Sequence, residues 1–311
     1  MQIERFCVSS HMDELKLGVI LVKPDKEPKA VLQILHGMCE HKERYLPFME
    51  YLAEHGFASI IHDHRGHGES VKEKGDFGYM YECGAKAIVE DTNQVNRLIR
   101  KTFPDVPCFL FGHSMGSLVA RSYIKRYDRV LDGAIICGSP SNNKLSRFGS
   151  GLAKVSGKIF GDKAKANHIT KLMFGHYNDD FENVTSENSW ICANEDTVRK
   201  YDEDERCGFI FTFNGMENLC KLVTNVYDKN NWQVNRKDMP IWFISGADDP
   251  CMGNHKSFEE AVQMLRDVGY TNVTSKLYKG MRHEILNEKD CNKVHRDILT
   301  QLEVWVDRCK K

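Results

Sequence analysis

The sequence predicts an α/β fold, in which a mostly parallel eight-stranded sheet has helices on both faces and a helical insertion late in the chain. Short apolar and β-branched runs alternate with longer stretches of helical periodicity along most of the 311 residues. A Gly-x-Ser-x-Gly pentapeptide stands between one such run and the next helical stretch. Roughly 95 residues separate two of the expected strands, far more than an ordinary connection between neighbouring elements.

The alternating elements follow the order that a doubly wound sheet requires. An N-terminal hairpin is expected over about residues 2–9 and 15–22, followed by strands near 30–36, 57–62, 106–112, 131–138, 239–246 and 272–279. Helices are expected over about 45–55, 83–103, 116–128, 255–268 and 288–308. The strand at 239–246 is apolar almost throughout, which is typical of a parallel strand buried on both faces.

The long segment divides the predicted core into two parts. We expect the N-terminal part of the core at residues 1–140, a helical cap, or lid, at 141–236, and the C-terminal part of the core at 237–311. Helical patterns near 146–174, 185–201 and 214–228 fill the insert. Its alternating phenylalanines at 209, 211 and 213 indicate either a strand-like core segment or a pocket wall.

The pentapeptide Gly112-His113-Ser114-Met115-Gly116 is the strongest functional signal in the chain. It follows the apolar run 106–111 and precedes a helical pattern, which is the strand-turn-helix context of a nucleophile elbow. Side chains at Gly112 and Gly116 would collide with neighbouring backbone in so tight a turn. Ser114 is therefore the candidate nucleophile, and it needs a base, an orienting acid and oxyanion donors.

The acid and the base should follow the nucleophile, each in a loop at the carboxyl end of a strand. The strand at 239–246 leads into Ala247-Asp248-Asp249-Pro250, and we select Asp249, with Asp248 as the alternative. His283 follows the strand near 272–279, whereas His255 and His295 fall in predicted helices. The predicted triad is Ser114, Asp249 and His283.

The oxyanion donors should be two backbone N–H groups, one after the nucleophile and one in the loop after an early strand. The strand at 30–36 runs into His36-Gly37-Met38, so the N–H groups of Met115 and Met38 are the expected donors. Because these are backbone groups, the two methionine side chains are free to line the pocket.

Five motifs together carry a resemblance to a known family. The segments are His36–Tyr45, Asp63–Ser70, Gly112–Gly116, Gly246–Pro250 and Arg282–Glu288. In this order they resemble the monoacylglycerol lipase and lysophospholipase branch of the α/β-hydrolases, which is also grouped with the serine aminopeptidase-like hydrolases. The resemblance implies the α/β-hydrolase fold, with Ser114 as nucleophile, Asp249 as acid and His283 as base. Cys39 departs from the family pattern, which has a small residue at this position.

Other motif residues are expected to support the loops. This group consists of His36, Gly37, Arg65, Gly112, His113 and Gly116. His62, His64 and His67 with Asp63 also suggest a metal site, but the run lacks further ligands nearby and matches a structural loop of the family. We therefore expect no metal and no organic cofactor.

Composition excludes several other classes of protein. The net charge of −1 and the absence of a long basic run argue against nucleic-acid binding. Eleven cysteines at scattered spacings, with no C-x-x-C pair, favour free thiols in a reducing compartment. No apolar signal core opens the chain, and no stretch approaches the roughly 20 apolar residues of a membrane span. We expect a soluble, cytoplasmic protein, and the oligomeric state stays open.

The predicted activity is hydrolysis of carboxylic esters through an acyl-enzyme intermediate. The resemblance implies single-chain lipid esters, and short-chain or aryl esters are the first alternative. Amide or aminopeptidase activity would need an anchor for an amino group, for which Asp179, Asp180 and Glu182 are candidates. A non-catalytic binding protein is the last alternative. The lysines and apolar residues of 154–174 suggest transient contact of the lid with a membrane surface, as an alternative to packing over the sheet.

Overall fold

The computed structural model describes residues 1–142, 145–182 and 184–310. Within these residues one sheet has eight strands in the order β1-β2-β4-β3-β5-β6-β7-β8, which confirms the predicted sheet. β1 (Gln2–Ser9) and β2 (Lys16–Lys23) form an antiparallel hairpin, and β2 pairs antiparallel with β4. The parallel strands are β3 (Val31–Leu35), β4 (Ala58–His62), β5 (Cys108–His113), β6 (Gly133–Cys137), β7 (Ile241–Gly246) and β8 (Val273–Tyr278).

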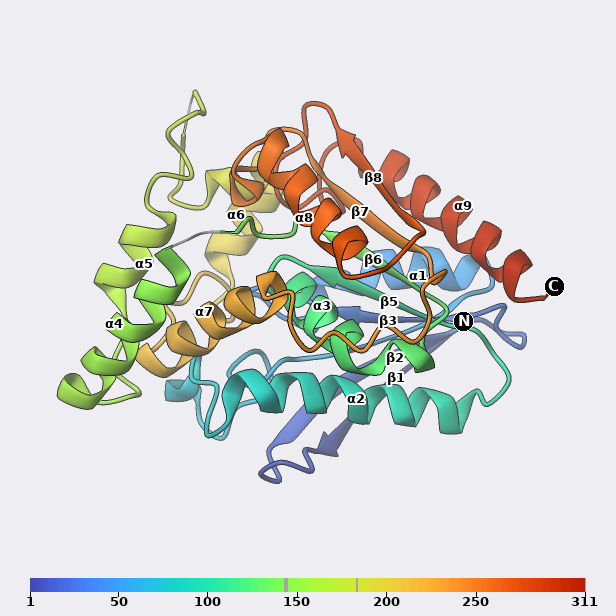
Figure 1. Ribbon diagram of the computed structural model, residues 1–311, viewed down its shortest axis with the longest axis horizontal. Helices are drawn as coiled ribbons and strands as arrows, with labels where there is room; N and C mark the ends of the chain where they lie inside the picture. The colour runs from blue at the N-terminus through green and yellow to red at the C-terminus, as the bar shows by residue number, and fades with distance from the viewer. Residues whose placement is uncertain (143–144, 183, 311) are drawn as a thin grey trace.

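Helices cover both faces of the sheet (Figure 1). α1 (Leu46–Glu54) and α9 (Cys291–Cys309) pack against one face, where they meet Phe109 and Phe111 of β5. α2 (Gly84–Thr102), α3 (Met115–Tyr127) and α8 (His255–Asp267) pack against the other face, where they meet Leu110. Successive strand residues point to opposite faces, so an uninterrupted apolar strand supplies both cores.

The segment 141–236, which we call the insert, lies between β6 and β7 and contains four helices within its described residues. These are α4 (Leu145–Phe160), α5 (Asn167–Phe174), α6 (Glu195–Glu203) and α7 (Phe213–Tyr227). α4 packs on α7, and α7 packs on α2 and α3 of the core. α4 and α5 lie at one end of the molecule, away from both chain termini (Figure 1).

Two helix predictions for the insert were wrong. A single helix over 146–174 does not form, because α4 ends before Gly161, whose φ of 96° is left-handed and continues no right-handed helix. The expected helix at 185–201 begins only at Glu195, after a short 3₁₀ turn at Ser189–Ile191. No helix in the described part of the chain is long and apolar enough to span a bilayer.

The sheet brings the functional loops to one edge. The loops after β3, β5, β7 and β8 all leave the carboxyl ends of parallel strands, and the insert leaves the neighbouring end of β6. This edge is where open α/β sheets form their sites.

Candidate active site

Ser114 lies at the turn between β5 and α3. Its φ of 52° and ψ of −119° are strained for a residue that carries a side chain. A Cβ on Gly112 would lie 2.4 Å from the Gly116 carbonyl oxygen, and a Cβ on Gly116 would lie 2.1 Å from the Leu35 carbonyl oxygen. Both positions therefore require glycine, and the turn exposes Ser114 to a cavity although its exposed fraction is only 9%.

Asp249 and His283 meet from the loops after β7 and β8. His283 Nδ1 lies 2.9 Å from Asp249 Oδ2, and both side chains are buried. Asp249 also accepts hydrogen bonds from the Ser245 hydroxyl and the Cys251 N–H, each at 2.8 Å. Burial alone raises the pKa of the Asp249 carboxyl, but His283 and these hydrogen bonds outweigh burial and hold the pKa below its ordinary value. An ionised Asp249 keeps the proton of His283 on Nδ1, which leaves Nε2 as the proton acceptor.

The neighbouring carboxylate is placed differently. Asp248 is exposed, and its backbone N–H donates to the Met281 carbonyl at 3.0 Å. Of the two candidate acids, only Asp249 hydrogen-bonds to His283 among the described residues.

A buried thiol lines the cavity together with the Ser114 hydroxyl. This thiol belongs to Cys251, and Tyr177 of the insert lines the same cavity. Burial raises the pKa of the Cys251 thiol, so this group is neutral. Within the described residues no hydrogen bond joins Ser114 to His283, although both line the same cavity. Catalytic hydrogen bonds often align only when substrate is bound, so this arrangement is compatible with a resting site.

The loop after β3 passes close to Ser114. A Cβ on Gly37 would lie 3.1 Å from Ser114 Cβ. Met38 and Met115 line the cavity on either side, and their backbone N–H groups have no acceptor in the part of the chain that the structure describes. Two such donors beside a nucleophile can bind a developing oxyanion.

Cys39 connects this loop to the insert. Its thiol donates to the Phe209 carbonyl at 2.8 Å, and its carbonyl accepts from the Tyr201 hydroxyl at 2.8 Å and from the Gly208 N–H at 3.0 Å. Burial raises the pKa of this thiol well above its ordinary value. The family pattern has a small residue at position 39, where this chain has a cysteine. The thiol of Cys39 therefore adds a hydrogen bond to the insert.

A buried ionic network connects the loop after β3 to the segment that carries His283. Glu40 accepts from the Gly37 N–H at 2.5 Å, from Arg44 at 2.6 Å and from the Tyr45 hydroxyl at 2.9 Å. Arg44 also donates two hydrogen bonds, of 2.7 and 2.6 Å, to Glu284, the residue that follows His283. The pKa of Glu40 stays below its ordinary value, because hydrogen bonding to His113 and the charge of Arg44 outweigh the effect of burial.

His113 lies between this network and His283. Its Nδ1 is 3.3 Å from Glu40 Oε1, its Nε2 is 3.2 Å from the His283 carbonyl oxygen, and the rings of His113 and His283 lie 4.6 Å apart. Burial lowers the pKa of His113, but Glu40 more than compensates and raises it. Because an acceptor faces each ring nitrogen, the doubly protonated ring satisfies both contacts.

The remaining motif residues support loops away from the reacting atoms. His36 Nε2 accepts from the His64 N–H at 2.9 Å, so its Nδ1 carries the proton that is donated to the Gly37 carbonyl at 2.8 Å. Arg65 is fully buried and pairs with Asp13 and with Asp91 of α2. It is not among the residues that line the Ser114 cavity.

The buried histidines at 36, 62, 64 and 67 form a packed cluster. Burial lowers the pKa of all four, to about 4 for His62 and His67. In the described chain their nitrogens do not belong to any group of close metal-ligand atoms. Asp249, Cys251 and His283 do form such a group, but the Asp249 carboxylate already has three hydrogen-bond partners, namely Ser245, the Cys251 N–H and His283.

The cavity beside Ser114 has a volume of about 470 Å³. Its apolar wall residues come from α3 and from the insert and include Leu118, Met173, Phe174, Phe209, Leu219 and Val223. Polar residues of the insert, including Asn167, Thr170 and Lys171, also line the cavity. Trp190 of the insert covers His283, with ring centroids 5.0 Å apart. Sequence reasoning had left the wall residues unassigned, and it had also missed the roles of Glu40, Arg44 and Glu284. The first two lie within the motif His36–Tyr45, so their charge was a usable signal.

Comparisons with known proteins show which family the chain resembles. The family Hydrolase_4, described as serine aminopeptidase, S33, matches residues 26–290. The monoglyceride lipase homolog of Monkeypox virus is 28% identical over 290 residues, which cover 91% of each chain. The monoglyceride lipase of Mus musculus is 25% identical over 290 residues, which cover 91% of this chain and 84% of that one.

The solved structures show the same fold. A thermostable carboxyl esterase from Bacillus coagulans, in complex with glycerol, aligns with a TM-score of 0.90 at 24% identity and covers 98% of this chain and 99% of its own. The family match includes every loop of the candidate site. The chain therefore belongs to the serine aminopeptidase, S33 family of α/β-hydrolases.

Proposed function

We propose that the protein is a serine hydrolase that cleaves carboxylic esters of single-chain lipids, such as monoacylglycerols or lysophospholipids. The observation that carries this proposal is the position of Ser114, on a strained turn that opens into a cavity with apolar side chains in its wall, beside the Asp249–His283 pair. The names of the relatives from Monkeypox virus and Mus musculus support a lipid ester as the substrate.

The mechanism uses the residues as a unit. His283 Nε2 accepts the Ser114 proton while Ser114 Oγ attacks the ester carbonyl carbon, and Asp249 stabilises the imidazolium that forms. The Met38 and Met115 N–H groups bind the oxyanion. His283 then gives its proton to the leaving alcohol, and water, activated by the same histidine, releases the fatty acid from Ser114.

The cavity supports a single acyl chain. Its volume of about 470 Å³ lies within the usual range for ligand pockets, and apolar side chains of α3 and of the insert form part of its wall. We propose that the insert acts as a cap, because it supplies most of the apolar wall and places Trp190 over His283. The peptidase alternative loses its suggested anchor, since Asp179, Asp180 and Glu182 are exposed and none of them lines this cavity.

A substrate panel tests the proposal. Product release from long-chain monoacylglycerol, lysophosphatidylcholine, short-chain aryl esters and aminoacyl amides would be measured by mass spectrometry, with Ser114→Ala as control. We expect the highest kcat/KM for a long-chain monoacylglycerol or lysophospholipid. Turnover confined to short aryl esters would favour a small-ester carboxylesterase instead, and turnover of aminoacyl amides alone would favour a peptidase.

The wall of the cavity should select chain length. Leu219 of α7 is 5% exposed and lines the cavity. Leu219→Trp should lower kcat/KM for a long-chain ester by at least about tenfold, since a loss of roughly 1.4 kcal/mol of acyl-chain contact suffices for that factor. The same variant should keep kcat/KM for a short-chain ester within about twofold, and an equal loss for both esters would contradict an acyl-binding wall.

The insert also presents an apolar surface to solvent. Val155, Ile159 and Phe160 of α4 and Leu172 of α5 are 53–68% exposed, and Lys154, Lys158 and Lys171 lie exposed on the same two helices. We propose that this surface contacts anionic lipid, because apolar side chains beside lysines match an anionic membrane interface.

Vesicle binding tests the surface. Ile159→Glu with Phe160→Glu should reduce co-sedimentation with phosphatidylserine vesicles at least about tenfold, because it removes apolar contact and adds negative charge. Val304→Glu is the matched control. Val304 is 45% exposed on α9, a helix that covers the sheet and is not part of the insert. Equal binding by the insert variant and the wild type would contradict this contact.

A further inference from the structure

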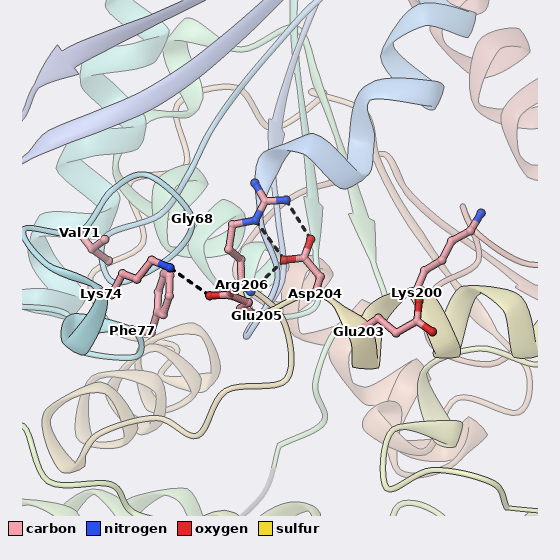
Figure 2. Close-up of a pocket in the computed structure, with 9 residues that line it drawn as sticks. All are labelled: Gly68, Val71, Lys74, Phe77, Lys200, Glu203, Asp204, Glu205 and Arg206. Carbon is pink, nitrogen blue, oxygen red and sulfur yellow. Dashed lines mark hydrogen bonds and ion pairs between the residues drawn. The ribbon is translucent and has the colours of Figure 1, made fainter.

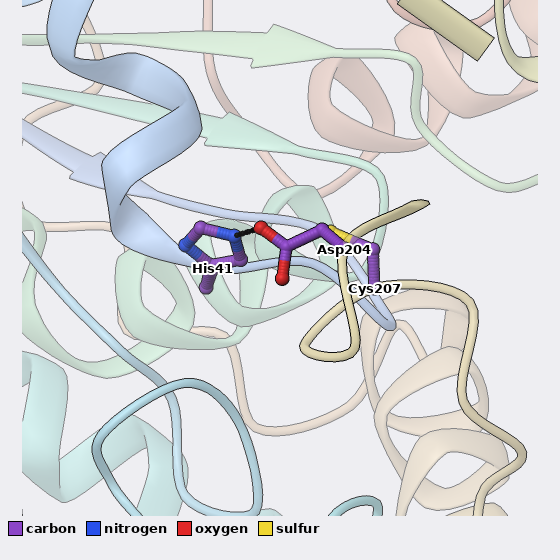
Figure 3. A group of neighbouring side chains, drawn as sticks. All are labelled: His41, Asp204 and Cys207. Atoms are coloured by element: carbon purple, nitrogen blue, oxygen red, sulfur yellow. Dashed lines mark hydrogen bonds and ion pairs between the residues drawn. The ribbon is translucent and has the colours of Figure 1, made fainter. Parts of the chain in front are cut away.

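Three ligand-type side chains meet where the insert joins the core. His41 comes from the loop after β3, and Asp204 and Cys207 come from the turn after α6. His41 Nε2 lies 2.9 Å from Asp204 Oδ2, and one ligand atom from each of the three residues lies within 4.8 Å of the other two. Figure 3 shows the His41 ring facing the Asp204 carboxylate, with the Cys207 sulfur beside it.

The chemistry of these side chains is that of a zinc site. Imidazole, carboxylate and thiolate are all zinc ligands, with bonds of about 2.0–2.3 Å, so ligand atoms around a tetrahedral ion lie roughly 3.3–3.7 Å apart. The present spacing spans that range, and His41 and Asp204 would separate by a few tenths of an ångström. The nitrogen and sulfur ligands disfavour calcium and magnesium, which take oxygen ligands.

Binding of an ion would move two protons. The Cys207 thiol would release its proton to solvent. His41 Nε2 would pass its proton to Nδ1, a buried atom without a hydrogen-bond partner among the described residues.

Arg206 is the competing cation. It donates to Asp204 Oδ1 at 3.1 Å from Nε and to Oδ2 at 2.9 Å from its terminal nitrogen. Its side chain is 42% exposed, so the guanidinium can leave Oδ2 for solvent. Ion binding therefore costs this partly exposed ion pair, which is a small stabilising interaction, and also the hydrogen bond between His41 and Asp204.

A pocket reaches the site from solvent at Asp204, whereas His41 and Cys207 do not line it. Asp204 and Arg206 form part of its wall, opposite Val71 and Phe77 of the core, and its volume is about 580 Å³ (Figure 2). Water from this pocket can supply a fourth ligand to an ion held by three side chains.

We propose that His41, Asp204 and Cys207 bind one divalent transition-metal ion of the zinc type, which links the insert to the loop after β3. The same turn of the insert already contacts this loop, because the Gly208 N–H donates to the Cys39 carbonyl. The ion would hold the insert next to the segment that carries Met38. This proposal concerns binding and does not depend on the proposed esterase activity.

Cobalt substitution tests the site directly. The purified, metal-free protein would be titrated with Co²⁺, with spectra recorded in the near ultraviolet and visible ranges. We expect one equivalent to give a thiolate-to-cobalt charge-transfer band and the intense visible bands of tetrahedral Co²⁺, and Zn²⁺ to remove both. Cys207→Ser should abolish the charge-transfer band, and Asp204→Asn should weaken binding by more than about 100-fold, since even outer partners of a metal ligand are worth 10–100-fold.

Cys220→Ser is the matched control, because Cys220 is a buried thiol of α7 outside the cluster. It should bind Co²⁺ as the wild type does. Each variant would first be checked for a cooperative thermal transition, and Asp204→Asn retains the thiol if Cys207→Ser fails to fold. A wild-type spectrum without a thiolate band, or a band that survives in Cys207→Ser, would overturn the proposal. Bound Zn²⁺ should also slow alkylation of Cys207 at least about tenfold, and unchanged alkylation would count against it.

Discussion

Replacing Ser114 or His283 with alanine is expected to lower kcat for ester hydrolysis by roughly a million-fold, and the double variant should be little worse than either single one. Ser114 supplies the attacking oxygen, and His283 is the group placed to accept its proton. Once one of them is missing, the other has no step to perform. Steady-state kinetics on the best substrate of the panel, with active-site labelling by a fluorophosphonate, measures the loss.

Two exposed residues provide controls for these variants. His255 opens α8 and Ser275 lies in β8, and neither lines the Ser114 cavity. His255→Ala and Ser275→Ala should therefore keep kcat within about twofold. Multiplicative losses in the Ser114 and His283 double variant would contradict a triad that acts as a unit.

The adjacent aspartates should differ by several orders of magnitude. Asp249→Asn is expected to lower kcat about ten-thousand-fold, because an amide in place of the carboxylate favours the wrong tautomer of the base. Asp248→Asn should keep kcat within about twofold, since Asp248 is exposed and only Asp249 hydrogen-bonds to His283 among the described residues. Rate measurements on the pair distinguish the two acids.

These two variants differ by one position in the same loop, so each is a control for the other. Asp248→Asn should unfold close to the wild type, because Asp248 is exposed. Asp249→Asn should be folded but less stable, by about 1–3 kcal/mol, because an amide nitrogen cannot accept the hydrogen bonds that reach this buried carboxylate. A larger loss of kcat in Asp248→Asn than in Asp249→Asn would reverse the assignment of the acid.

The core of the fold could be predicted because its signals are local. Uninterrupted apolar strands such as Ile241–Gly246 indicate a parallel sheet, and their alternation with amphipathic helices leaves few arrangements of the chain. The insert carries weaker signals. Its apolar residues recur with helical spacing across Gly161, so periodicity predicted one long helix where the backbone turns at a left-handed glycine.

The candidate site divides in the same way. Ser114 and its glycines were predictable because the strain of a tight turn permits few residues. Glu40 shows the opposite case. It accepts hydrogen bonds from Gly37, Arg44 and Tyr45, and it contacts His113. No local pattern in the sequence shows that this buried carboxylate joins the loop after β3 to the residues around His283. Such a network stabilises the fold only when every buried polar group has a hydrogen-bond partner. Only the folded structure shows which groups pair.

The sequence by itself determined the sheet, its covering helices and the order in which the loops of Ser114, Asp249 and His283 follow parallel strands, because propensity, periodicity and turn sterics act over a few residues. Tertiary structure decided which of Asp248 and Asp249 contacts His283, which side chains of the insert line the cavity, and that His41 meets Asp204 and Cys207. These contacts join residues far apart in the chain. Their partners are chosen by packing of the insert on the core, a property that no short stretch of sequence contains.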